Sequence, residues 1–92
     1  MAARVVPRLS SVTVSVGAAA VQVAAGRSSR GSVIVQNVHA AQTLYVGGDS
    51  NVTAANGLQL RPNESVTLVD FVGPVWAVAS GAATDTRVLE TY

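Results

Sequence analysis

The sequence of 92 residues contains no cysteine and no lysine, and charged residues of any kind are few. The absence of cysteine excludes disulfide bonds and zinc sites built from thiolates. Six arginines stand against five acidic residues, so the net charge is +1, and only 12% of the chain is charged, compared with about 25% in an ordinary soluble domain. A nucleic-acid interface needs many cations on one face, and we therefore expect no nucleic-acid partner.

Long apolar runs and catalytic motifs are missing as well. No run approaches the roughly 18 residues of a membrane span, so we expect no membrane partner, and residues 1–12 lack the apolar stretch of a secretory signal. An aspartate and a serine could in principle complete a catalytic triad with His39, the single histidine, but a polar residue at the tip of a hairpin is the better explanation. Since no nucleophile motif and no closely spaced pair of carboxylates is present, we expect a protein that is not an enzyme and binds no cofactor.

Valine and alanine are abundant instead, and they alternate with polar residues at a period of two. Val12, Val14 and Val16, for example, share one face of a run whose other face is serine and threonine. This alternation is typical of β-strands, which β-branched valine favours. We predict an all-β fold, a compact antiparallel β-sandwich that is jelly-roll-like or a small barrel, with about eight short strands. The predicted strands are residues 11–16, 20–23, 32–38, 43–46, 58–60, 65–71, 75–79 and 86–92.

The chain is short enough for a single core, so we predict one β-sandwich domain over residues 10–92. No partner strand is evident for residues 1–9, which we predict to form an extended N-terminal arm. Tight turns separate the strands, and Pro62 and Asn63 suit the two central positions of one of them.

The segment of residues 47–57 contains three glycines and raises the question of a binding loop. A phosphate loop requires a helix directly after it, and here Pro62 and the strand pattern forbid one. A calcium site needs six to eight oxygen ligands, while Asp49 is the one carboxylate in this stretch. We therefore predict that the segment turns the chain and holds neither phosphate nor metal.

Two segments, residues 32–38 and 72–79, are apolar on both faces, although a strand of a small sandwich has only one core face. With so little charge, a monomer would expose apolar patches that soluble monomers rarely show. We therefore predict that the second faces are buried between copies of the chain. The residues predicted for this oligomer interface are Val33, Val35, Val75, Trp76 and Val78.

Six short motifs follow one another in residues 31–92: Gln36-Asn37, Gly47-Gly48, Asn56-Gly57, Pro62-Asn63-Glu64, Trp76-Ala77 and Arg87-Val88. In this order they resemble a recurrent small module of tailed bacteriophages. Asn63 stands where that module often has glycine, a change that is compatible with the turn. The members of the module look like virion surface components, namely capsid decoration (cement) proteins, parts of head fibres or domains of tail proteins. The resemblance implies a β-sandwich that is commonly a homotrimer.

Together these features predict a structural virion protein that decorates the outer surface of a phage capsid as a homotrimer and stabilises the shell. Its partners would be further copies of itself and the major capsid protein. The residues predicted to dock onto the capsid are Arg4, Val5, Val6 and Arg8.

Other interpretations stay open at this point. Arg27 and Arg30 flank a loop, where they either keep the chain soluble or contact an acidic surface. The protein could instead belong to a phage tail or baseplate. It could also be the glycan-binding module of a head fibre that stacks sugars on Trp76 and Tyr45, although core or interface packing suits these two aromatic residues better.

Overall fold

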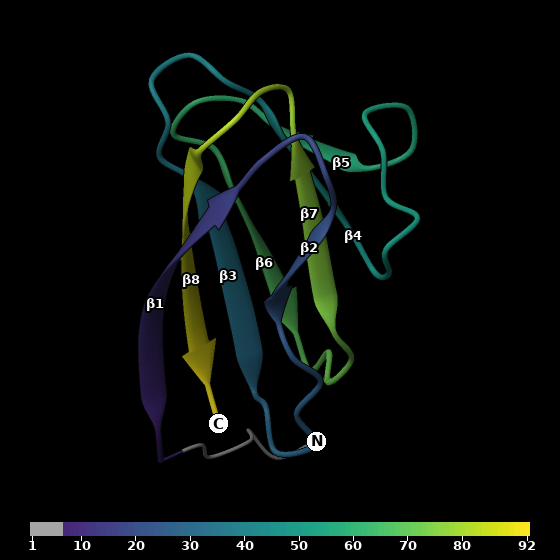
Figure 1. Cartoon of the computed structure of the whole chain (residues 1–92). Coiled ribbons are helices and arrows are strands. Elements are labelled where there is room, and N and C mark those ends of the chain that lie inside the picture. The colour runs from purple at the N-terminus through teal and green to yellow at the C-terminus, as the bar shows by residue number, and fades with distance from the viewer. Residues whose placement is uncertain (1–6) are drawn as a thin grey trace.

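The computed structural model describes residues 7–92, which fold into eight antiparallel strands arranged as two packed four-stranded sheets (Figure 1). The strands form where apolar and polar residues alternate, because β-branched side chains pack well on a pleated, half-buried surface. No helix in this part of the chain is long and apolar enough to cross a membrane. The strands are β1 (Leu9–Val16), β2 (Val21–Ala24), β3 (Ser32–Asn37), β4 (Leu44–Gly47), β5 (Leu58–Leu60), β6 (Ser65–Val69), β7 (Val75–Ala79) and β8 (Thr84–Thr91).

The connections between the strands make a jelly roll. Sheet A has the order β1-β8-β3-β6, and sheet B has the order β2-β7-β4-β5. The pairs β1–β8, β2–β7, β3–β6 and β4–β5 are nested along the chain, so the polypeptide winds back and forth between the two sheets. The predicted all-β sandwich of jelly-roll type is confirmed. Because the sheets do not close into a barrel, the sandwich keeps four edge strands: β1 and β6 in sheet A, β2 and β5 in sheet B.

The core lies between the two sheets and consists mainly of valine. In sheet A, Val33, Val35 and Val88 point inward from neighbouring strands and are at most 1% exposed. Leu44 and Ala77 meet them from sheet B, and both are fully buried. The buried apolar cluster comprises Val16, Val23, Ala24, Val33, Val35, Leu44, Val46, Leu60, Val75, Ala77, Ala79 and Val88.

This packing corrects the predicted oligomer interface. Val33, Val35 and Val75 are at most 1% exposed within a single chain, and Val78 is 8% exposed, so these side chains are covered without a second copy. The prediction failed because the pattern of a strand with two apolar faces does not show which face the core takes. Trp76 is half-buried on the outer face of sheet B. That the chain forms an oligomer stays a prediction.

Sheet A begins earlier in the chain than the predicted domain. Leu9 pairs with Thr91. Arg8 donates its backbone N–H to the Tyr92 carbonyl (2.7 Å) and accepts the Tyr92 N–H in return (2.9 Å). The sheet therefore extends into the segment predicted as an arm. The other predicted docking residues, Arg4, Val5 and Val6, lie outside the described residues.

The turn predicted at Pro62 is present between β5 and β6. The Glu64 N–H donates to the Arg61 carbonyl (3.0 Å), and Asn63 has a φ of 68°, a left-handed conformation that asparagine tolerates. The Glu64 carboxylate in turn accepts the Arg61 N–H (2.7 Å). A main-chain hydrogen bond and a side-chain hydrogen bond between Arg61 and Glu64 thus stabilise this turn.

Candidate functional site

The glycine-rich segment between β4 and β5 is a loop that packs onto sheet B. A Cβ atom added at Gly47 would lie 2.8 Å from Val52, and one added at Gly57 would lie 2.8 Å from Tyr45. Both positions therefore need glycine for the loop to approach the sheet. As a result Val52, in the middle of the loop, is only 6% exposed.

The side-chain oxygen atoms of this loop accept hydrogen bonds from the backbone of the loop. The Asp49 carboxylate accepts the Asn51 N–H (2.9 Å). The Asn56 amide oxygen accepts the Thr53 N–H (2.8 Å), and its amide nitrogen donates to the Asn51 carbonyl (3.2 Å). Among residues 7–92 the structure brings together no group of three or more His, Cys, Asp or Glu residues that could hold a metal ion. The polar groups of the loop are used to turn the chain.

His39 lies in the connection between β3 and β4, where it organises the backbone. Its Nδ1 accepts hydrogen bonds from the N–H groups of Ala41 and Gln42, both at 3.0 Å. In a catalytic triad the same ring nitrogen would donate to a carboxylate that orients the imidazole. The geometry thus favours the interpretation of His39 as a turn residue.

Arg30 and Glu90 form a buried ion pair near one end of the sandwich. Arg30 is 0% exposed and Glu90 is 7% exposed, and the Arg30 Nε donates to the Glu90 carboxylate at 2.8 Å. The guanidinium also donates to the backbone carbonyls of Phe71 (3.2 Å), Gly73 (2.7 Å) and Ala25. A buried charge is tolerated when it is paired and hydrogen-bonded. One side chain therefore ties β8 to the loops that precede β3 and β7, and Arg30 is not the surface residue considered from the sequence.

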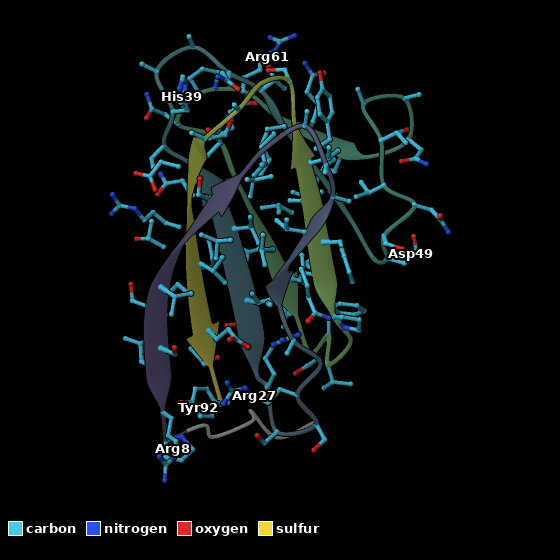
Figure 2. All side chains as sticks on the ribbon, in the orientation of Figure 1. Arg8, Arg27, His39, Asp49, Arg61 and Tyr92 are labelled. Atoms are coloured by element: carbon cyan, nitrogen blue, oxygen red, sulfur yellow. The ribbon has the colours of Figure 1, made fainter. Side chains whose placement is uncertain are left out.

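Arg27, by contrast, is accessible. Its guanidinium carbon lies 3.6 Å from the centroid of the Tyr92 ring, a cation–π contact, and its side chain is 38% exposed. Figure 2 shows Arg8, Arg27 and Tyr92 together at one end of the sandwich, with Arg61 at the other. The loop after β6 reaches the same end, since the Arg27 N–H donates to the Val72 carbonyl (2.8 Å). We name this surface the arginine end; it comprises Arg8, Arg27, Phe71, Val72 and Tyr92.

The outer face of sheet B carries two half-buried aromatic side chains, Trp76 and Tyr45. The register places Gln22 opposite Trp76 and Gln59 opposite Tyr45, so an exposed amide flanks each ring on the neighbouring strand. Aromatic rings offer apolar faces for stacking, and amides offer hydrogen-bond donors and acceptors. We name this set of four residues the aromatic–amide row.

An apolar groove of about 370 Å³ opens along one side of the sandwich, between the edge strands β5 and β6. Val66 and Leu68 line it from β6, and Val46 and Leu58 line it from sheet B. Leu58 is 52% exposed, and Val69 at the end of β6 is 70% exposed. The large apolar side chains exposed in the described part of the chain are Leu9, Val12, Leu58, Val69, Phe71 and Val72.

The surface position of Phe71 and Val72 differs from the prediction, in which the strand of residues 65–71 continues to Phe71. The strand ends at Val69, and Asp70 then takes a left-handed conformation with a φ of 58°. The signal was the turn sequence around the pair, since Asp70 precedes it and Gly73 follows it. Two apolar residues between turn residues indicate an exposed apolar loop.

No protein-family model matches the sequence, and no curated protein is similar to it. Solved structures share its fold at low sequence identity. The stem and receptor-binding domain of the spike protein P1 from bacteriophage PM2 matches with a TM-score of 0.66 at 15% identity. This match covers 90% of the present chain and 33% of the spike chain, so the present chain spans about a third of the spike structure.

Two further structures extend the comparison. A protein of Bacillus endospore appendages, which form disulfide-linked pili, matches with a TM-score of 0.56 at 16% identity over 92% of this chain and 84% of that one. A de novo designed double-stranded β-helix matches with a TM-score of 0.53 at 17% identity over 94% of this chain and 100% of the designed one. At these identities the likeness concerns the fold, and the chain is a compact jelly roll of the double-stranded β-helix type.

Proposed function

We propose that this protein is a structural component of a phage virion, a decoration protein that binds the outer surface of the capsid as an oligomer. The observation that carries the proposal is the exposure of several large apolar side chains on a domain with only 12% charged residues. Soluble monomers rarely expose contiguous apolar patches larger than a few hundred Å², and larger patches indicate interaction sites. The fold shared with a phage spike domain supports a place on the virion.

The arginine end is the surface that we propose to face the capsid. Phe71 and Val72, 39% and 42% exposed, supply apolar area, while Arg8 and Arg27 supply positive charge. Residues 1–6 precede this end in the chain and contain one arginine and two valines, the same combination of basic and apolar side chains. Apolar anchors within a charged rim are the usual composition of a specific protein interface.

A protein that docks across the junction between capsid subunits acts as a clamp. Burial of about 1,000 Å² of apolar surface contributes on the order of 25 kcal/mol before the costs of association, which consume most of it. The remainder adds to the free energy needed to separate the subunits when packaged DNA presses on the shell. This role requires a rigid body with an adhesive surface and no catalysis.

Binding to capsids tests the proposal with two substitutions that change the charge equally at opposite ends of the sandwich (Figure 2). The full chain is expected to co-sediment with capsids assembled from the major capsid protein of the same phage. Arg8→Glu is expected to weaken that binding about tenfold, or about 1.4 kcal/mol, because it reverses a charge at the arginine end. Arg61→Glu is expected to leave it unchanged. Removal of residues 1–6 keeps β1 intact and is expected to weaken the binding as well.

Circular dichroism of each variant verifies that it is folded. If the full chain did not co-sediment with capsids, the decoration role would be wrong. If Arg8→Glu and Arg61→Glu bound equally, the arginine end would not be the docking surface. Mass spectrometry of separated heads and tails distinguishes the tail or baseplate alternative, which predicts peptides of this chain in the tail fraction alone.

A glycan-binding role is the second candidate, and the aromatic–amide row of sheet B favours it. Signal on a glycan array that disappears with Trp76→Ala would support this role, because the substitution removes the larger stacking face. Phe71→Ala is the matched control, since it removes an exposed aromatic ring from a different surface. If both variants bound glycans as the wild type does, or if the wild type bound none, the aromatic–amide row would not be a sugar site.

A further inference from the structure

We propose that copies of this chain join head to tail, with the free edge of β6 in one copy paired with the free edge of β1 in the next. These are the two outer strands of sheet A, at opposite ends of the order β1-β8-β3-β6 (Figure 1). The proposal specifies the partner and the surface for the oligomer in the proposed function. It rests on the edges of sheet A, and its test needs no capsid and leaves Arg8 unchanged, so the two proposals can fail separately.

The edge strands of sheet A, β1 and β6, lack the usual protection against pairing with another chain. Edge strands present unpaired backbone N–H and C=O groups, and proteins usually protect them with charges, prolines, bulges or short length. In sheet B, β5 has only three residues, and β2 has a register shift between Gln22 and Ala24. In sheet A, β1 has eight residues and β6 has five, with no charged residue, no proline and no register shift in either.

The strands of sheet A also run in the directions that this pairing requires. Every neighbouring pair in sheet A is antiparallel, so β6 runs opposite to β1. Two copies placed side by side in the same orientation therefore bring β6 next to an antiparallel β1 and continue the sheet. All copies then point the arginine end to the same side, as binding to one surface requires. Antiparallel pairing of β6 with a second β6 would instead turn the second copy end over end.

Each of the two edge strands carries an exposed apolar side chain. Leu9 on β1 and Val69 on β6 are 67% and 70% exposed. In a register that places them opposite each other, they cover each other on the outer face of the joined sheet. The same register places Val12 of the second copy opposite Val66 of the first. Both of these side chains lie on the core side of their own sheet, so Val12 extends over the apolar groove.

Residues of opposite charge lie next to the two edge strands. In this register Arg8, directly before β1, lies opposite Asp70, directly after β6, and both residues are exposed in the single chain. A shift by two residues would keep the faces matched but would separate the opposite charges and the pair of Leu9 and Val69. Charge and apolar contact therefore favour the same register.

A contact between two different edges leaves one free edge on each outermost copy. The copies form a closed ring if the rotation between them closes and an open row if it does not. A single strand edge is small compared with the standard stable interface of about 1,600 Å². We therefore expect one contact alone to be weak and a ring, in which every copy makes two contacts, to persist at lower concentration.

Sedimentation of the full chain and of two edge variants tests the proposal. Leu9→Lys and Val69→Lys each add a charge inside the proposed contact at a position that is exposed in the single chain. The wild type is expected to assemble, and each variant alone is expected to be a monomer, with the dissociation constant raised at least tenfold. An equimolar mixture of the two variants is expected to form a dimer at concentrations above the dissociation constant of a single contact, because one supplies an intact β6 edge and the other an intact β1 edge.

Two further variants sharpen the test. Leu9→Glu combined with Val69→Lys in one chain is expected to restore assembly, because each contact then joins opposite charges. Val72→Lys changes an exposed apolar residue away from both edges, and it is expected to assemble as the wild type does. A wild type that stays monomeric at every concentration would overturn the proposal. So would assembly of Leu9→Lys alone, or a mixture of the two edge variants that stays monomeric.

Discussion

Replacement of Arg30 by alanine is expected to lower the free energy of unfolding by about 3–5 kcal/mol, a large share of the about 5–15 kcal/mol that stabilises a typical domain. The substitution leaves the Glu90 carboxylate, which is 7% exposed, without the Arg30 guanidinium at 2.8 Å and with the more exposed Arg27 Nε at 3.6 Å. It also removes the donor to the backbone carbonyls of Ala25, Phe71 and Gly73. Urea unfolding followed by the tryptophan fluorescence measures the change.

Arg87→Ala is the matched control. Arg87 also lies beside an aspartate, with 3.3 Å between its NH2 group and the Asp85 carboxylate, but their side chains are 54% and 44% exposed. Water already solvates that pair, so the free energy of unfolding is expected to change by no more than about 0.5 kcal/mol. Arg30→Lys is expected to fall between the two, because an ammonium keeps the charge without the fork of donors. Equal stability of the two alanine variants would show that the buried pair is not needed for the fold.

The buried pair also positions the proposed docking surface. The Arg30 side chain bonds the loop that carries Arg27 to the loop that carries Phe71 and Val72. Those loops form the arginine end together with Tyr92, whose ring contacts Arg27. The buried Arg30 therefore fixes the positions of the exposed side chains that form the arginine end.

The strands were predictable because they follow from a local sequence pattern, the alternation of apolar and polar residues. Period-two alternation requires only that one face be buried, and each predicted strand overlaps an observed one. The choice of face was not predictable where both faces are apolar, so Val33 and Val35 were assigned to an interface while they lie in the core. The pairing of Arg8 and Leu9 with sheet A was not predictable either, because it depends on residues far away in the sequence. The partners of Arg8 and Leu9 are Tyr92 and Thr91, at the other end of the sequence.

The role of Arg30 depends on a contact across 60 positions of the sequence. A partial signal exists in Glu90, which has the same parity as Val88 in its strand and must therefore point toward the core. A carboxylate in that position requires a cation. Which of the six arginines supplies it is decided by the tertiary fold, which no local pattern contains.

Several of the motif residues that resemble the phage module hold loops and turns of the fold in place. Gly47 and Gly57 allow the loop after β4 to pack on the sheet, and Asn63 supplies the left-handed position of a turn. Asn37 is fully buried and joins the connection between β3 and β4 to the end of β5. These residues therefore stabilise the fold, while the surfaces proposed for capsid docking and assembly lie at the arginine end and on the edges of sheet A.

Replacement of Asn37 by aspartate is expected to be among the most damaging single changes, although the two side chains have nearly the same shape. The Asn37 amide nitrogen donates to the carbonyls of Gln42 (2.7 Å) and Leu60 (2.9 Å), and its oxygen accepts the His39 N–H (3.0 Å). Aspartate places an oxygen against two carbonyl oxygens in a site that is 0% exposed. We expect a loss of about 3 kcal/mol or more in the free energy of unfolding, measured by urea titration.

Asn56→Asp provides the control, since it makes the same chemical change at an exposed asparagine whose amide donates to a carbonyl at 3.2 Å. Water can solvate the new carboxylate there, and a loss of less than about 1 kcal/mol is expected. Asn37→Ala separates the two effects of the buried change, because it removes the hydrogen bonds without adding a charge. It is expected to cost less than Asn37→Asp and more than Asn56→Asp. The reverse order of the two Asn37 variants would mean that the lost hydrogen bonds, rather than the buried charge, dominate at this site.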